Sequence, residues 1–71
     1  MPNTTQYPIP QGEQLHTVGA VATHLAISRS KLYAMMDGGE LPYVKLGKSR
    51  RIRWSDVMRL IERSRVGGDR A

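Results

Sequence analysis

The chain contains no cysteine, so disulfide bonds and metal sites built from thiolates are excluded. It also lacks any apolar run near the ~18 residues that a membrane-spanning helix needs. Residues 1–14 hold neither lysine nor arginine and no apolar core, so we expect no secretory signal peptide there. That segment has three prolines among polar residues, which predicts a flexible arm without helix or strand.

Acidic residues are few. Their positions are Glu13, Asp37, Glu40, Asp56, Glu62 and Asp69. Because they are scattered, they do not indicate the converging carboxylates of a hydrolase or nuclease. His16 and His24 stand eight residues apart with no acidic neighbour at metal-binding spacing, so we expect both imidazoles to be exposed. The sequence therefore predicts a protein that is not an enzyme and has no metal or cofactor.

Positive charge is abundant and segregated. With 71 residues the chain has room for one small domain, and its eleven Lys and Arg against six Asp and Glu give a net charge of +5. Residues 1–28 contain no Lys or Arg, whereas residues 45–53 contain five and no acid. This clustering predicts an anionic partner. Nucleic acid fits better than a membrane, because the basic stretch lacks a wide apolar face.

Apolar side chains recur at helical spacing in two adjacent segments. The first segment has Val18, Val21, Ala22 and Leu25, and the second has Leu32, Met35 and Met36. Thr17 and Ser28 stand just before these segments and predict N-caps, although Gly19 weakens the first helix. Residues 26–28 leave only a tight turn between the helices, which favours a steep crossing. Gly38-Gly39 ends the second helix.

After Pro42 the pattern changes to period two, which predicts a β-hairpin with Lys48-Ser49-Arg50 at its tip. We expect Val44, Leu46 and Ile52 to face inward and Lys45, Arg51 and Arg53 to face outward. Ser55 predicts the cap of a third helix, with Asp56 in its first turn and Val57, Leu60 and Ile61 on its apolar face. The predicted class is mainly α with a small β-hairpin: a folded domain over residues 15–65, then a tail over 66–71.

The second predicted helix offers a candidate nucleic-acid face. Opposite its apolar side, Ser30 and Ala34 are flanked by Lys31, Tyr33 and Asp37, with Arg29 in the first turn and Ser28 before it. A narrow face with short side chains bordered by donors suits the major groove, which is about 12 Å wide. Ser28 and the free N–H groups of the first turn suit a phosphate oxygen. The alternative is an ordinary solvated helix face, and Tyr33 fits either a phosphate contact or packing against the hairpin.

The predicted hairpin favours the nucleic-acid interpretation. Like charges on paired strands destabilise a hairpin unless a polyanion neutralises them. If about five phosphates are engaged, the logarithm of the binding constant falls with the logarithm of salt concentration with a slope near −4 to −5. A basic loop that contacts nothing is the alternative. Trp54 is expected to plug the core or to cover the third helix, with stacking on a base as the second possibility.

Several motifs in fixed order resemble the excisionase-type winged helix-turn-helix DNA-binding domain, which is related to MerR-like domains. The matching runs are Leu15-His16-Thr17-Val18, Val21-Ala22, Leu25-Ala26-Ile27-Ser28, Leu32-Tyr33, Gly39-Glu40-Leu41-Pro42, Lys45-Leu46-Gly47, Arg51-Ile52 and Ser55-Asp56-Val57. The resemblance covers roughly residues 15–63. The sequence departs from the family at Ala20, where an acid completes the first capping box, and at Ala26, where glycine is usual. It also has Trp54 where a polar or basic residue is common.

The resemblance implies a second helix in the major groove and a hairpin wing on the backbone or the adjacent minor groove. On the helix it implicates Ser28, Arg29, Ser30, Lys31 and Tyr33, and on the wing Lys48, Ser49, Arg50 and Arg51. Lys45 and Arg53 join the wing because both are expected on its outer face. If Ala26 is left-handed, alanine costs on the order of 1 kcal/mol there.

The resemblance also implies a function. Phage and mobile-element members are recombination directionality factors that bind and bend DNA beside an attachment site and help an integrase to excise the element. We therefore expect double-stranded DNA and an integrase as partners, and a monomer in solution that associates cooperatively on DNA. The expected location is the cytoplasm, at the nucleoid of a bacterial host. Two alternatives remain: a small MerR-like transcriptional regulator, and a protein-interaction module whose basic wing meets an acidic partner.

Overall fold

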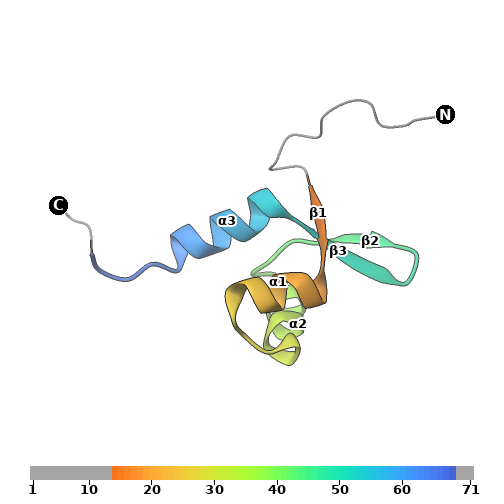
Figure 1. Cartoon of the computed structure of the whole chain (residues 1–71), viewed down its shortest axis with the longest axis horizontal. Helices are drawn as coiled ribbons and strands as arrows, with labels where there is room; N and C mark the ends of the chain where they lie inside the picture. The colour runs from red at the N-terminus through yellow and green to blue at the C-terminus, as the bar shows by residue number, and fades with distance from the viewer. Residues whose placement is uncertain (1–13, 69–71) are drawn as a thin grey trace.

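The computed structural model describes residues 14–68 and contains three helices and a small antiparallel sheet with strand order β1-β3-β2. In chain order the elements are β1 (Leu15–Thr17), α1 (Val18–Leu25), α2 (Arg29–Asp37), β2 (Val44–Leu46), β3 (Ser49–Arg53) and α3 (Trp54–Arg63). The β2–β3 hairpin projects from one end of the domain, and α3 extends from the other (Figure 1). This arrangement confirms the predicted class, a small winged helix-turn-helix domain.

The strand β1 is an element that the sequence did not predict. It pairs with β3 so that Leu15 lies opposite Arg53 and Thr17 opposite Arg51. The carbonyl of Gln14 continues this ladder by accepting a hydrogen bond of 3.0 Å from the N–H of Trp54. A strand of three residues is too short to show a period-two pattern. Gln14, placed in the arm by the sequence, is therefore hydrogen-bonded to the start of α3, and residues 1–13 of that arm lie outside the described part of the chain.

Two of the three predicted helix caps are confirmed. The hydroxyl of Thr17 accepts a hydrogen bond of 3.0 Å from the N–H of Ala20, and that of Ser28 accepts one of 3.0 Å from the N–H of Lys31. The prediction for Ser55 is wrong, because α3 already begins at Trp54 and its N-cap residue makes no capping hydrogen bond through its side chain. The cause is that β3 runs directly into α3 without a loop.

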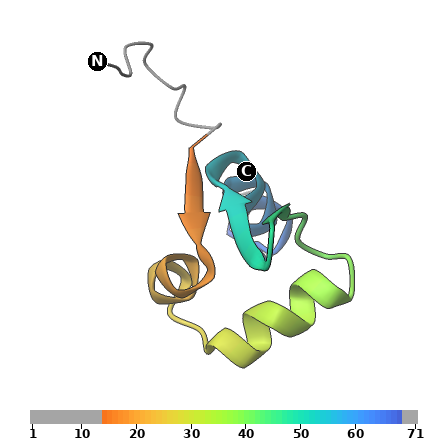
Figure 2. The same cartoon turned by 90° about the vertical axis from the view of Figure 1, so that its right-hand side faces the viewer.

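The turn between α1 and α2 depends on Ala26, whose φ of 57° lies in the left-handed region. This conformation brings the N–H of Ile27 to 3.0 Å from the carbonyl of Ala22 and closes the first helix. Figure 2 shows α1 nearly end-on and α2 lengthwise, so the two helices cross steeply, as the short turn predicts. Ala26 is therefore left-handed, and the cost expected for alanine in that conformation applies.

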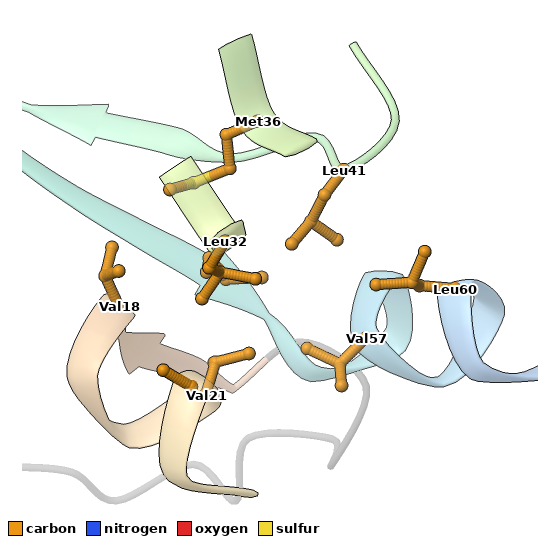
Figure 3. Close-up of a cluster of buried hydrophobic side chains, with 9 residues drawn as sticks. Val18, Val21, Leu32, Met36, Leu41, Val57 and Leu60 are labelled. Carbon is orange, nitrogen blue, oxygen red and sulfur yellow. The ribbon is translucent and has the colours of Figure 1, made fainter. Parts of the chain in front are cut away.

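One hydrophobic core joins all three helices and the sheet (Figure 3). Its buried members are Val18, Val21, Ala22, Leu32, Met36, Leu41, Ile52, Val57 and Leu60. Leu25, Met35 and Trp54 are partly buried and pack against it. Ile61, which the sequence placed on the apolar face of the third helix, is exposed. The predicted role of Trp54 in packing is confirmed.

The inward position predicted for Ile52 is confirmed, but the predicted faces of Val44, Lys45 and Leu46 in β2 are wrong. Val44 pairs with Arg51 and Leu46 pairs with Ser49, and directly paired residues share a face, so Ile52 lies on the opposite face. Ile52 is fully buried, whereas Leu46 is 52% exposed. The cause is the length of the turn, because only two residues, Gly47 and Lys48, connect the strands. A turn of three residues would have shifted the pairing by one residue and placed Ile52 on the same face as Val44 and Leu46.

The register also separates the cations that were expected on one outer face. Lys45 lies opposite Arg50 on one face of the hairpin, whereas Arg51 shares the other face with Val44. Arg53 lies on the same face as Arg51, two residues further along β3. The wing is therefore basic on both faces, and each face has to be considered separately.

Candidate nucleic-acid interface

The outer side of α2 is exposed, as the helical spacing predicts. Leu32 and Met36 point into the core, while Ser30, Lys31 and Ala34 on the other side are open to solvent. Arg29 begins the helix and is also exposed. Ser30 and Ala34 are short, and the longer exposed side chains of Lys31 and Tyr33 border them, a shape that suits a DNA groove.

A cleft of about 380 Å³ brings the start of α2, the first turn of α1 and the wing together. Its lining residues are Thr17, Val18, Gly19, Arg29, Tyr33, Lys48, Ser49, Arg50 and Arg51. Two of them come from the predicted helix site and four from the predicted wing site. Arg29 and Tyr33 of α2 therefore share one cleft with the tip of the wing, whereas Ser30 and Lys31 are not among its lining residues.

Thr17, Val18 and Gly19 also line the cleft, although the sequence did not predict them in the site. They lie in the cleft because β1 pairs with β3 and thereby places the start of α1 beside the wing, with Thr17 opposite Arg51. The only sequence signal was Gly19 itself, an unfavourable residue within the first turn of a helix.

Arg50 is half-buried and makes several contacts within the protein. Its Nη1 atom lies 3.1 Å from the carboxylate of Asp37, and its guanidinium lies 5.1 Å from the ring centre of Tyr33 and 4.4 Å from that of Tyr43. Nη1 makes no hydrogen bond, so the attraction to Asp37 is that of an ion pair. These contacts connect the end of α2 to the wing and fix their relative position. They also show Tyr33 packed against the hairpin, one of its two predicted roles.

Arg53 is also engaged within the protein. Its Nε and Nη2 atoms donate to Asp56 over 3.1 and 3.4 Å, and Arg59 donates to the same carboxylate over 2.9 Å. Asp56 is only 3% exposed. The sequence predicted Asp56 in the first turn of the third helix, where it is found, but did not predict that it binds two arginines. Arg53 therefore braces the junction between β3 and α3.

The remaining predicted cations have no acidic partner within residues 14–68. They are Arg29, Lys31, Lys45, Lys48 and Arg51. Arg51 donates to the carbonyl of Arg50 over 3.0 Å, and its side chain is half-buried. Lys45 and Lys48 are exposed on the wing. These five cations are the charges available to an external anion.

The rings of both histidines contact that of Trp54. The ring centre of His16 is 5.2 Å from that of Trp54, and the ring centre of His24 is 4.6 Å from it. His24 is exposed as predicted, but His16 is half-buried, because β1 places it against the start of α3. Among the residues that the structure describes, no three histidine or acidic side chains gather into a metal site.

No helix in the described part of the chain is sufficiently long and apolar to span a bilayer. No curated protein and no solved structure gave a significant match to the chain. The model of one protein family, the helix-turn-helix domain, matches residues 17–65. That match covers α1, α2, the wing and α3, and the first three of these contribute residues to the basic cleft. The chain therefore belongs to the helix-turn-helix domain family, a family of DNA-binding proteins.

Proposed function

We propose that this protein is an architectural DNA-binding factor, an excisionase, that binds and bends attachment-site DNA so that an integrase excises a phage or mobile element. The observation that carries the proposal is the cleft between α2 and the wing, which gathers cations from both elements on one side of a small domain. The resemblance to excisionase-type domains in the order and spacing of motifs supports the specific role. The protein would supply binding and bending, and the integrase would supply the chemistry.

The proposed docking places α2 in the major groove and the wing on the flanking backbone. Lys31 lies on the exposed side of α2 and is suited to a base edge or a phosphate. Lys45 and Lys48 project from the wing and are suited to phosphates. If each of the five available cations neutralises one phosphate, the salt slope is about −4 to −5.

Bending would follow from gripping the duplex at two places with a rigid body. Arg50 holds the wing to α2 through Asp37 and two tyrosine rings, so the two contact elements cannot separate freely. A duplex that meets both elements has to follow their relative orientation, and the deformation costs of order 1–6 kcal/mol for bends of 40–90°. Extra phosphate contacts along the bent path would offset that cost.

A domain of this size covers a short stretch of DNA. Useful affinity would then come from several copies on adjacent sites, with contacts between neighbours raising the effective concentration of each. The exposed segment after α3, residues 64–68, is available for a neighbouring copy or for the integrase.

Footprinting on the native genomic neighbourhood tests the proposal. Protection of direct repeats beside a recombination core, together with stimulation of excision by the partner integrase, is the expected result. Protection confined to a promoter would favour a transcriptional regulator. Weak DNA binding with a shallow salt slope, and tighter binding to an acidic protein, would favour a protein-interaction module.

A further inference from the structure

Gly19 occupies a position whose backbone conformation does not require glycine. It lies in the first turn of α1, and it is not among the residues with positive φ. Glycine within a helix is less favourable than alanine, because it loses more backbone freedom on folding. The advantage of glycine at this position must therefore come from what lies beside it.

The guanidinium of Arg29 occupies the space that a side chain at position 19 would take. A Cβ atom on Gly19 would stand 2.9 Å from Nη2 of Arg29 and 3.4 Å from both Cζ and Nε. All three atoms belong to the far end of a flexible side chain. A methyl group at position 19 would therefore displace the guanidinium without disturbing the backbone of either helix.

The place where Arg29 lies is a lining position of the basic cleft. Gly19 and Arg29 share that lining with Lys48 and Arg51 of the wing. No carboxylate within residues 14–68 pairs with Arg29. Because Gly19 has no side chain, a guanidinium without an acidic partner can lie against the first turn of α1, in the cleft that the wing cations also line.

We propose that Gly19 is a positioning residue for DNA binding: it seats the guanidinium of Arg29 against α1, where it binds a backbone phosphate lying in the cleft between α2 and the wing. The proposal rests on the proposed DNA-binding function and refines it. Arg29 begins the groove-facing helix, and its sequence position suits either a base edge or a phosphate. Because the guanidinium lies against Gly19 in the cleft, we assign it to a phosphate contact. Such a contact contributes to affinity and not to sequence preference.

The variant Gly19→Ala tests this assignment with two readouts that should move in opposite directions. Alanine favours the helix, so the melting temperature should rise by a few degrees, about 2–5 °C. Displacing Arg29 should weaken binding to a short fluorescein-labelled duplex of mixed sequence by roughly tenfold, the worth of one charge-assisted hydrogen bond. The salt slope should become shallower by about 0.9, which corresponds to one lost phosphate contact.

Two further variants make the test specific. Arg29→Ala should weaken binding to the same degree, and the double variant Gly19→Ala/Arg29→Ala should bind like Arg29→Ala alone, because the first change acts through the second residue. Gly38→Ala is the matched control. Gly38 also has negative φ, but it caps the end of α2 outside the cleft, and we expect unchanged duplex affinity.

The outcomes separate this inference from the function on which it rests. If the wild-type protein shows no salt-dependent binding to duplex DNA, the proposed function fails. If the wild type binds and Gly19→Ala binds equally well with the same salt slope, only the role of Gly19 is overturned. Additive losses in the double variant, or a loss of affinity accompanied by a lower melting temperature, would also overturn it.

Discussion

The left-handed alanine at the turn between α1 and α2 gives a prediction whose sign differs from that of most glycine substitutions. Ala26 has φ of 57°, where an L-residue with a Cβ atom is strained by about 1–2 kcal/mol. Its methyl group is exposed, so removing it forfeits little packing. Glycine loses about 0.4–1 kcal/mol more conformational entropy on folding. The difference predicts that Ala26→Gly raises the free energy of unfolding by about 0.5–1 kcal/mol.

Thermal and urea denaturation followed by circular dichroism measure this change. The melting temperature should rise by about 3–6 °C, and the urea midpoint by roughly 0.5–1 M. The matched control is Ala34→Gly, the same exchange at an exposed position inside α2, which should lower the free energy of unfolding by about 1 kcal/mol. Destabilisation by both variants would refute the reasoning, because it would show that residue 26 is not held in the left-handed region in solution.

Three further predictions concern the charges of the domain. Asp56→Ala should lower the free energy of unfolding by about 1–3 kcal/mol in urea denaturation, because it removes a buried carboxylate that binds two arginines. An unchanged urea midpoint would show that this carboxylate does not stabilise the fold. Arg50→Ala should lower the free energy of unfolding by about 1 kcal/mol and broaden the amide resonances of the wing, because the contacts with Tyr33 and Tyr43 are removed. Unchanged resonances of the wing would show that Arg50 does not hold it in place. Lys48→Ala should leave the melting temperature unchanged, weaken binding to all duplexes alike and reduce the salt slope by about 0.9 in fluorescence anisotropy, whereas a change of sequence preference would place Lys48 in a groove.

The helical part of the fold could be predicted from the sequence because its signals are local. Thr17 and Ser28 cap helices whose apolar residues recur at helical spacing, and the tight turn between them favours a steep crossing. The strand β1 gave no such signal. It has three residues, and its pairing with β3 joins parts of the chain more than thirty residues apart. Pairing over that separation is decided by the tertiary structure and not by a local pattern.

The sequence predicted the candidate site as a set of residues and could not predict which of their side chains make contacts within the protein. The sequence grouped Arg50 and Arg53 with the other cations of the wing, because charge and strand position are all that it reveals. The structure gives both arginines acidic partners, Asp37 and Asp56, which lie on helices on either side of the hairpin. The pairing register of the hairpin was missed for a related reason. A two-residue turn at Gly47 and a three-residue tip are similar in sequence, but only the three-residue tip would place Ile52 on the same face as Val44.

The central claim is that α2 and the wing bind one duplex from the same side. Titration of the ¹⁵N-labelled protein with duplex DNA, followed by amide chemical shifts, tests it most directly. We predict that resonances of residues 29–34 and 48–51 shift together with one binding isotherm, while those of the exposed side of α3, including Met58 and Ile61, stay unchanged. Shifts confined to one of the two elements, or centred on α3, would contradict the account.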